Sequence, residues 1–336
     1  MLRLPDFNYL VPRSLGEAAQ ALADLGEDAM AVAGGTDVYA KMKRGQFSPR
    51  HLVSLRAIRE LKGIDPQHER GLWIGAGETL RAIAQHRAIS DLFPALSHAA
   101  GSVAMPQIRN VATIGGNLFV DTRCNQYDQS FFWRQAAGFC MKKDGERCLV
   151  APGSEKCLAV FSSDTAPVLQ SLEAKAILQS SDGERTVAMS ELYQEDGINF
   201  CLRRRDELLR GIIVPRESFE WRNIYLKLRR RDSFDFPILG VAAALNLDRD
   251  GVCVGARVIL TGVSSAPKAI AEASILEGKR IDAELIEHVA EQAAKQAHPL
   301  DNADTSAWYR KRMTKVYVAR ALGALSGLRP AANLEQ

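Results

Sequence analysis

Two glycine-containing segments, AVAGGTDV (residues 31–38) and TIGGN (residues 113–117), decide the fold that we expect for this chain. Each places a glycine pair after an apolar stretch that we predict to be a strand. Because glycine has no Cβ, neighbouring backbone N–H groups can converge on an anion, and Thr or Asn adds a side-chain donor. Two such turns, about 80 residues apart, can hold the two phosphates of one pyrophosphate.

The alternative for each segment is a plain tight turn, which is the commoner meaning of either motif taken alone. Neither segment has the spacing of the G-x-G-x-x-G dinucleotide fingerprint, and neither is followed by the long helix of a βαβ unit. A Rossmann-type NAD site is therefore disfavoured.

The composition predicts an ordinary globular protein. The 336 residues are 46% hydrophobic and 25% charged, which is enough for two or three domains. The formal net charge is only +3, and the short basic runs at 203–205 and 229–231 lack interleaved aromatic residues, so nucleic-acid binding is disfavoured. No apolar run is long enough to span a membrane, and the first residues do not resemble a secretory signal, so we expect a cytoplasmic location.

The first part of the chain is expected to mix short strands with helices. Ser14 and Glu17 form a capping pattern before a helix that ends at Gly26. Further elements are predicted from their apolar periodicity as strands at 29–33, 51–55, 72–77 and 208–215, helices at 79–89 and 91–103, and a helix running into a strand at 164–178.

The pattern changes after a boundary that we place between Pro215 and Trp221. Strands are predicted at 221–228, 237–247 and 251–260, with the last two joined as a hairpin, and helices at 282–297 and 305–326. We expect the last helix to point Trp308, Met313, Val316 and Tyr317 toward a core, and the tail 329–336 to be frayed. The order of elements indicates an α+β fold.

The order of these segments resembles one known family. AVAGGTDV, MPQIRNVATIGGNL (105–118), SDTAPVLQSLEA (163–174), YLKLRRRDSFDFPILGVAAAL (225–245) and GVSSAPKA (262–269) follow one another as in the FAD-binding subunits of the xanthine oxidase, or molybdenum hydroxylase, family. The resemblance extends from about Phe7 to Leu325. It implies a vanillyl-alcohol-oxidase-type (PCMH-type) FAD-binding domain at 1–218 and a small C-terminal α+β domain of the CO dehydrogenase flavoprotein type at 219–326.

The same resemblance implies which residues hold FAD. The first turn and its flanks would lie along the pyrophosphate, the second turn would be the other clamp, and further residues would lie near the ribityl chain or the isoalloxazine. These residues are Ala31, Val32, Ala33, Gly34, Gly35, Thr36, Asp37 and Val38 in the first turn, Thr113, Gly116 and Asn117 in the second, and Val103, Asp164, Leu209 and Lys227 elsewhere.

Four of the six cysteines, Cys124, Cys140, Cys148 and Cys157, are clustered in one polar and aromatic stretch. Asn117 and Asp164 are 47 positions apart, far more than in ordinary members of the family, so we expect an insertion loop at about 119–160. The remaining cysteines, Cys201 and Cys253, are expected to be ordinary buried thiols.

The spacing of the four cysteines, C-x15-C-x7-C-x8-C, leaves more than one kind of site open. Paired C-x2-C knuckles, typical of structural zinc, are missing, and disulfides are disfavoured in a reducing compartment. Four thiolates on a long loop suit a [4Fe–4S] cluster, although zinc is not excluded.

The insertion and its spacing resemble the 4-hydroxybenzoyl-CoA reductase branch of the family, whose flavin subunits carry an additional [4Fe–4S] cluster. This resemblance implies a chain that passes electrons from ferredoxin toward a molybdenum subunit, through a small subunit with two [2Fe–2S] clusters, for reductive dehydroxylation of an aromatic CoA thioester. It also implies a dimer of heterotrimers. Around the cluster we expect either shielding by Phe131, Phe132, Trp133 and Phe139 or simple packing of the loop by these rings. Arg134, Lys142, Lys143 and Arg147 are expected to attract an acidic ferredoxin.

Two other functions stay open at this point. The nearer alternative is the flavin subunit of an oxidative molybdenum hydroxylase. The more distant one is a non-catalytic assembly protein in which the loop binds zinc.

Overall fold

The computed structural model describes residues 3–328, so the tail at 329–336 that was expected to fray lies outside the described residues. The chain begins with a small parallel sheet of strand order β1-β3-β2, made of β1 (Asn8–Leu10), β3 (His51–Ser54) and β2 (Ala29–Val32). Helix α1 (Leu15–Leu25) packs on this sheet, with Ser14 as its N-cap and Gly26 as its C-cap, as the sequence predicts. Leu15, Ala18 and Leu22 form its buried face.

A five-stranded antiparallel sheet lies next to the small sheet. Its strand order is β4-β5-β8-β6-β7, with the strands at Ile64–Asp65, Gly71–Gly75, Leu208–Pro215, Lys175–Ser180 and Gly183–Ala188. Strand β8 therefore returns between β5 and β6 although about 130 residues separate β5 from β8. Because β8 pairs with both β5 and β6, the chain between β5 and β8 starts and ends in the same sheet.

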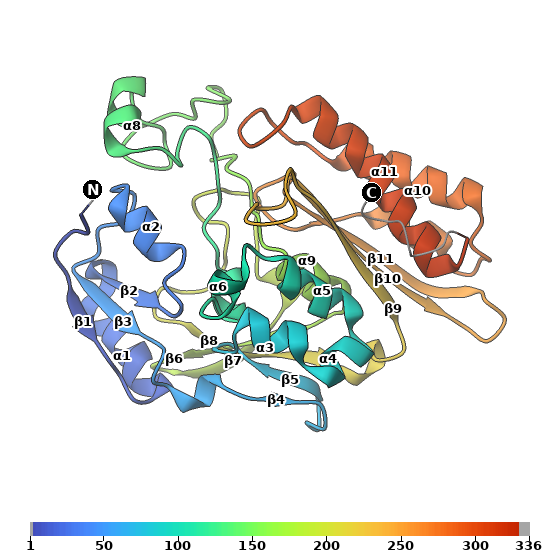
Figure 1. Ribbon diagram of the computed structural model, residues 1–336, viewed down its shortest axis with the longest axis horizontal. Coiled ribbons are helices and arrows are strands. Elements are labelled where there is room, and N and C mark those ends of the chain that lie inside the picture. The colour runs from blue at the N-terminus through green and yellow to red at the C-terminus, as the bar shows by residue number, and fades with distance from the viewer. Residues whose placement is uncertain (1–2, 329–336) are drawn as a thin grey trace.

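Short helices cover this sheet and connect it to the second domain. They are α3 (Leu80–Gln85), α4 (Arg87–Leu92), α5 (Pro94–Ser102), α6 (Pro106–Arg109), α7 (Ile114–Leu118) and α9 (Thr165–Ser171). Pro94 and Pro106 occupy first helical positions, where a missing N–H costs nothing. In Figure 1, α5 and α9 lie between the five-stranded sheet and the strands of the second domain.

The second domain is a four-stranded antiparallel sheet backed by two helices. Its strand order is β12-β11-β10-β9, with strands Lys268–Ala269, Cys253–Thr261, Leu239–Leu247 and Arg222–Leu228. Helices α10 (Ala283–Gln296) and α11 (Ala307–Ser326) lie side by side on its outer face (Figure 1). The predicted hairpin pairs β10 with β11 as expected.

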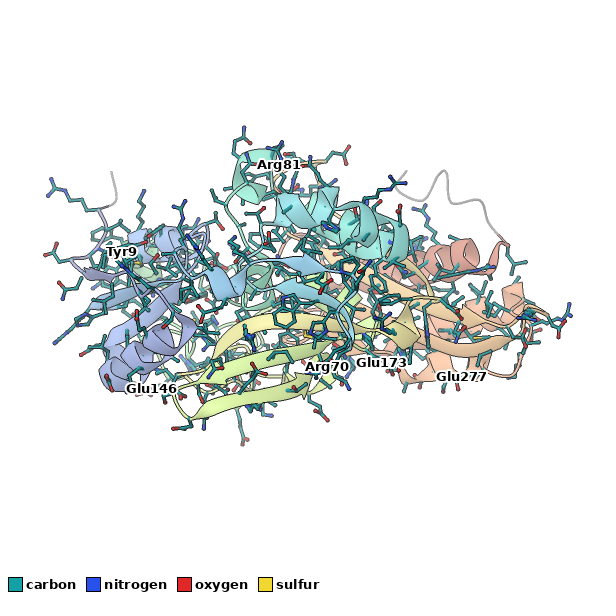
Figure 2. The ribbon with its side chains drawn as sticks, turned by 90° about the horizontal axis from the view of Figure 1, so that it is seen from below. Tyr9, Arg70, Arg81, Glu146, Glu173 and Glu277 are labelled. Carbon is teal, nitrogen blue, oxygen red and sulfur yellow. The ribbon has the colours of Figure 1, made fainter. Side chains whose placement is uncertain are left out.

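Strand β10 is apolar and buried along most of its length because both faces of its sheet are covered. Val241 and Ala243 belong to the core beneath α10 and α11, whereas Ala242 belongs to the core of the first domain. The alternation of side chains along a strand thus divides one strand between two cores. The two domains are consequently packed together through an apolar interface, with charged side chains such as Arg70, Glu173 and Glu277 at the periphery (Figure 2).

Two expectations from the sequence are wrong. The TIGGN segment does not follow a strand. Thr113 is the N-cap of α7, and the two glycines of the segment lie in the first turn of that helix. Trp308 does not face a core, because it lies in the first turn of α11 and its exposed fraction is 67%; Tyr317, two turns later, is buried as predicted. Among residues 3–328 there is no helix long and apolar enough to cross a membrane.

Candidate flavin and sulfur sites

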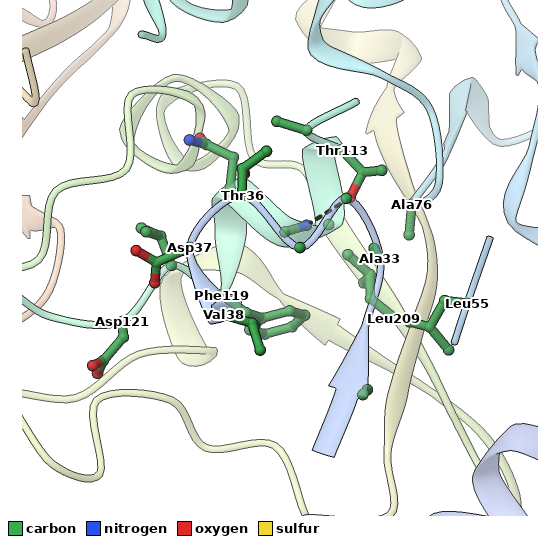
Figure 3. A pocket seen from close by; sticks show the side chains of 18 of the residues that line it. Ala33, Thr36, Asp37, Val38, Leu55, Ala76, Thr113, Phe119, Asp121 and Leu209 are labelled. Carbon is green, nitrogen blue, oxygen red and sulfur yellow. Dashed lines mark hydrogen bonds between the residues drawn. The ribbon is translucent and has the colours of Figure 1, made fainter. Parts of the chain in front are cut away.

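A cleft of about 800 Å³ opens between the two glycine segments and the first residues of β8. In Figure 3, Thr36 and Asp37 are drawn on the left of the lining, Thr113 and Ala76 at the upper right, and Ala33 and Leu209 at the lower right. The volume lies within the usual range of about 300–1,000 Å³ for cofactor pockets. Residues far apart in sequence therefore meet at one binding cavity.

The AGGTD turn brings unpaired backbone donors to this cleft. A Cβ on Gly34 would lie 2.2 Å from the carbonyl oxygen of Val111, so only glycine lets the turn pack against the segment before α7. Gly35 has a φ of +71°, a conformation that other residues rarely adopt. Within the described part of the chain, the amides of Gly35, Thr36 and Asp37 donate no hydrogen bond to another residue. They are free to bind an anionic ligand.

The second glycine segment presents the first turn of α7. The hydroxyl of Thr113 accepts a hydrogen bond of 3.0 Å from the amide of Gly116, drawn as a dashed line in Figure 3. A Cβ on Gly116 would meet only this hydroxyl, at 3.2 Å, and would otherwise point into open space. Gly116 thus leaves room in the cleft that a larger side chain would occupy.

Asn117 and Asp164 line the cleft, but their side chains are held by protein donors. The Oδ1 of Asn117 accepts hydrogen bonds from Ser163 Oγ at 2.8 Å and from Thr165 Oγ1 at 2.7 Å. Asp164 accepts from Tyr225 Oη at 2.7 Å and from Lys227 Nζ at 3.0 Å. These bonds order the start of α9 and join it to β9 of the second domain.

All but two of the residues that were predicted to hold FAD line this cleft. Val32 is fully buried in β2 and packs with Met42 and Leu52. Lys227 lies behind Asp164, where burial lowers the pKa of its ammonium group and Asp164 opposes that change. Both therefore support the wall of the cleft from outside.

Several other residues that line the cleft were not predicted from the sequence. Its lining also includes Arg56, Phe119, Asp121, Cys201, Phe234 and Phe236. Cys201 was expected to be an ordinary buried thiol, but it is half-buried and lines the cleft, whereas Cys253 is buried in the second domain. Phe119 and Asp121 lie two and four positions after Asn117, so closeness to the GGN segment is the one sequence signal that could have found them.

Comparison with known families explains the cleft. A model of the FAD binding domain in molybdopterin dehydrogenase matches residues 5–217, and a model of the CO dehydrogenase flavoprotein C-terminal domain matches residues 223–325. The chain belongs to the FAD-binding subunits of molybdopterin dehydrogenases. It is thus a flavoprotein subunit of the oxidoreductases known as molybdenum hydroxylases.

Relatives of this flavin subunit match it over nearly its whole length. The carbon monoxide dehydrogenase medium chain of Afipia carboxidovorans is 30% identical, with 94% of this chain and 95% of the relative covered. The 6-hydroxypseudooxynicotine dehydrogenase complex subunit alpha of Paenarthrobacter nicotinovorans is 28% identical, with 98% of each chain covered. In structure, a chain of carbon monoxide dehydrogenase from Hydrogenophaga pseudoflava superimposes with a TM-score of 0.78 and 26% identity, covering 97% of this chain and 99% of the other.

The four clustered cysteines of the flavin subunit line a second, smaller pocket. Cys124, Cys140, Cys148 and Cys157 surround it together with apolar side chains that include Met141, Leu149 and Val150. Burial raises the pKa of the Cys124 thiol to about 12 and also raises the pKa of Cys157. The amide of Ala151 donates a hydrogen bond of 3.4 Å to the sulfur of Cys148. The fold therefore gathers thiols that are spread over 34 positions of the sequence.

The described side chains form no preassembled metal site. Within residues 3–328, no group of three or more His, Cys, Asp or Glu side chains is placed to hold one metal ion. A structural zinc needs its four ligands within about 2.3 Å of one point. The four cysteines share one pocket, in which no such geometry is preformed.

The second domain closes this pocket from the other side. In the loop between α10 and α11, Asn302 donates through Nδ2 to the carbonyl oxygen of Leu158 at 2.7 Å, and its own carbonyl accepts from the amide of Asn125 at 2.7 Å. Leu158 and Asn125 are the direct neighbours of Cys157 and Cys124. Asn302 lines the pocket, and its buried Oδ1 has no hydrogen-bond partner among the described residues.

The expected roles of the aromatic and basic residues in the insertion need correction. Helix α8 (Phe131–Ala137) stands apart from the body in Figure 1, and none of Phe131, Phe132, Trp133 and Phe139 lines the cysteine pocket. Phe132 is 75% exposed. Arg134 and Lys142 are buried in internal contacts and cannot attract a partner at the surface, whereas Lys143 and Arg147 are partly or fully exposed.

Proposed function

We propose that this chain is the FAD and [4Fe–4S] electron-transfer subunit of a molybdenum-dependent complex. The observation that carries the proposal is the common pocket of Cys124, Cys140, Cys148 and Cys157. A cubane cluster binds four thiolates at four separate iron corners, so its ligands need to surround a volume and not a single point. The buried, largely apolar surroundings also suit a cluster that must be shielded from water.

The proposed FAD site is the cleft between the two glycine segments. The free amides of the AGGTD turn and the open side of Gly116 fit a pyrophosphate, and Val103 and Leu209 offer apolar contacts beside it. FAD would supply one- and two-electron exchange, while the chain binds and orients it. In this proposal the flavin domain comprises residues 1–218, with the cluster loop at about 119–160, and the second domain comprises residues 219–326.

The proposal includes a direction of electron flow, from the cluster toward FAD. We infer that reduced ferredoxin delivers electrons at the cluster and that they pass through FAD, and then through the two [2Fe–2S] clusters of a small subunit, to a molybdenum subunit. There they would remove the phenolic hydroxyl of 4-hydroxybenzoyl-CoA or a similar aromatic substrate. Support comes from the insertion itself, since iron–sulfur centres can reach the low potentials that such a reduction requires.

The names of the relatives favour a second candidate. They include carbon monoxide, nicotinate and 6-hydroxypseudooxynicotine dehydrogenases. In this alternative the same two centres would carry electrons outward from an oxidised substrate. Potentiometric titration followed by EPR would distinguish the two: a sulfur centre more reducing than FAD supports entry of electrons, and a centre well above FAD supports the oxidative alternative.

The cluster assignment can be tested with Cys140→Ser. Iron content and flavin absorbance would be measured on the same anaerobic sample of the full chain. We expect loss of most of the iron with FAD retained, because the thiol lies outside the flavin cleft. Loss of flavin with full retention of iron would contradict the assignment.

A further inference from the structure

A buried charge network lies between the flavin cleft and the cysteine pocket. Asp121, which lines the cleft, accepts hydrogen bonds from Lys41 Nζ at Oδ2 (2.7 Å) and from Lys142 Nζ at Oδ1 (2.8 Å). Lys142 lines the cysteine pocket, and Lys41 belongs to α2 (Val38–Lys43), which follows the AGGTD turn. One carboxylate that lines the cleft is therefore shared by Lys41 and by an ammonium group that lines the cysteine pocket.

Both lysines are almost completely withdrawn from solvent. The side chain of Lys41 is 1% exposed and that of Lys142 is 6% exposed. Lys142 also donates to Thr122 Oγ1 at 2.7 Å and to the carbonyl oxygen of Gly197 at 2.6 Å, so all three of its N–H donors have acceptors. Such an ammonium group is held in one position, beside the sulfurs.

One aromatic ring lies close to both cations. Lys41 Nζ lies 4.5 Å and Lys142 Nζ lies 4.9 Å from the centroid of Tyr127, whose ring also borders the cysteine pocket. Burial would raise the pKa of Asp121, but Lys142 and Lys41 lower it overall, so the carboxylate is ionised at neutral pH. Water, which would screen these charges, is largely excluded from the space between the pockets.

We propose that Asp121 couples the two pockets electrostatically, by holding the Lys142 ammonium group at the cysteine sulfurs while its own charge faces the flavin cleft. The inference rests on the proposed iron–sulfur centre, because the coupling acts on the charge of that centre. Lys142 favours the reduced, more negative centre, and Asp121 opposes it. Asp121 also disfavours an anionic ligand in the cleft. Asp121 and Lys142 are thus positioning residues that set the electron affinity of one site and the anion affinity of the other.

The test compares the full chain carrying Asp121→Asn, Lys142→Gln, Lys142→Arg or Lys143→Gln with the unaltered protein. At a fixed applied potential, Asp121→Asn should raise the ratio of reduced to oxidised centre about tenfold, which corresponds to about 59 mV for one electron. It should also lower the dissociation constant of FAD severalfold. Lys142→Gln should lower the reduced fraction to a similar extent, and Lys142→Arg should leave it nearly unchanged.

Lys143→Gln is the matched control. It removes the same charge from the neighbouring residue, which pairs with Asp144 and does not line the pocket. The coupling is supported if the reduced fraction rises in Asp121→Asn, falls in Lys142→Gln and stays unchanged in the control. A purely structural role would disturb the site in the same way in both variants. If Asp121→Asn fails to fold, the contrast between Lys142→Gln and Lys142→Arg decides.

Two results would count against the inference, and they differ. In protein that binds iron, a reduced fraction that shifts in the same direction in Asp121→Asn and Lys142→Gln, or in neither, would overturn the coupling alone. Equal effects of Lys142→Gln and Lys142→Arg on the reduced fraction would do the same. Absence of iron from the unaltered protein would overturn the proposed centre and the coupling with it.

Discussion

Lys227 and Asp164 form a buried ion pair that joins the two domains. Lys227 Nζ lies 3.0 Å from Asp164 Oδ2 and also donates to the carbonyl oxygen of Ser102 at 3.0 Å. The side chains are 1% and 2% exposed. A buried charge that loses its partner is strongly destabilising, so this pair fixes how β9 meets the start of α9.

Lys227→Met should lower the free energy of unfolding by about 3–5 kcal/mol, since it leaves the Asp164 carboxylate buried without its cation. Arg230→Ala is the control, because it removes an exposed ion pair with Asp304 in the same part of the chain and should cost no more than about 1 kcal/mol. Chemical denaturation of both variants would measure the difference. Equal, small effects would show that the buried pair contributes little.

Gly116→Val should release FAD. A branched side chain would enter the cleft beside Thr113, where the backbone must approach the ligand closely. Gly16→Val serves as the control, because a Cβ at Gly16 meets no atom within 4 Å and Gly16 lies in α1, away from the cleft. Flavin fluorescence after gel filtration would report retention. A folded Gly116→Val protein with stoichiometric FAD would show that Gly116 serves only the turn.

Gly197→Ala should weaken iron binding. A Cβ there would lie 2.9 Å from the sulfur of Cys157 and 2.7 Å from the amide nitrogen of Ala159, so the thiol would have to move. Gly153→Ala is the matched control in the cysteine loop, since a Cβ at Gly153 meets nothing within 4 Å. The rate of iron loss to a chelator would be followed by absorbance. Identical rates for both variants would argue against close packing at Cys157.

The stability of the flavin domain should depend on acid pH through Glu207. Arg185 donates to both of its oxygens and lowers the pKa of Glu207 below its usual 4.5, although burial opposes this. The carboxylate is therefore favoured in the folded state, and its contribution is complete above about pH 4.5 and lost as pH falls through the lower folded value.

Glu207→Gln should consequently cost about 1.5–3 kcal/mol at neutral pH, and the difference from the unaltered protein should shrink below pH 4.5. Thermal unfolding at several pH values would show this narrowing. A difference that stays constant from pH 7 to pH 3 would contradict the assigned ion pair.

Local sequence signals predicted the regular elements well. The Ser14 cap, the hairpin of β10 and β11 and the glycine at the end of α1 depend on neighbouring residues, so periodicity and capping chemistry were sufficient to find them. TIGGN was misread because a Gly pair after an apolar stretch is compatible with either a turn or the first turn of a helix. The hydrogen bond from Gly116 to the Thr113 hydroxyl and that from the Asn117 amide to the Thr113 carbonyl show that the segment starts a helix.

The composition of the two pockets was harder to predict because it depends on contacts between distant segments. Nothing adjacent to Asn302 in sequence indicates that it closes the cysteine pocket, and Asp121 gains its position from Lys41 and Lys142, which are 80 and 21 residues away. Arg134 and Lys142 were expected at the surface from their charge. The fold buries them because each finds carbonyl or carboxylate acceptors inside.

The proposed iron–sulfur cluster in the cysteine pocket of this flavoprotein subunit can be measured directly. Metal and flavin analysis of anaerobically purified full chain tests it most directly. We expect about four iron and about one FAD per chain, with no stoichiometric zinc. About one zinc per chain, or one FAD with no iron, would contradict it.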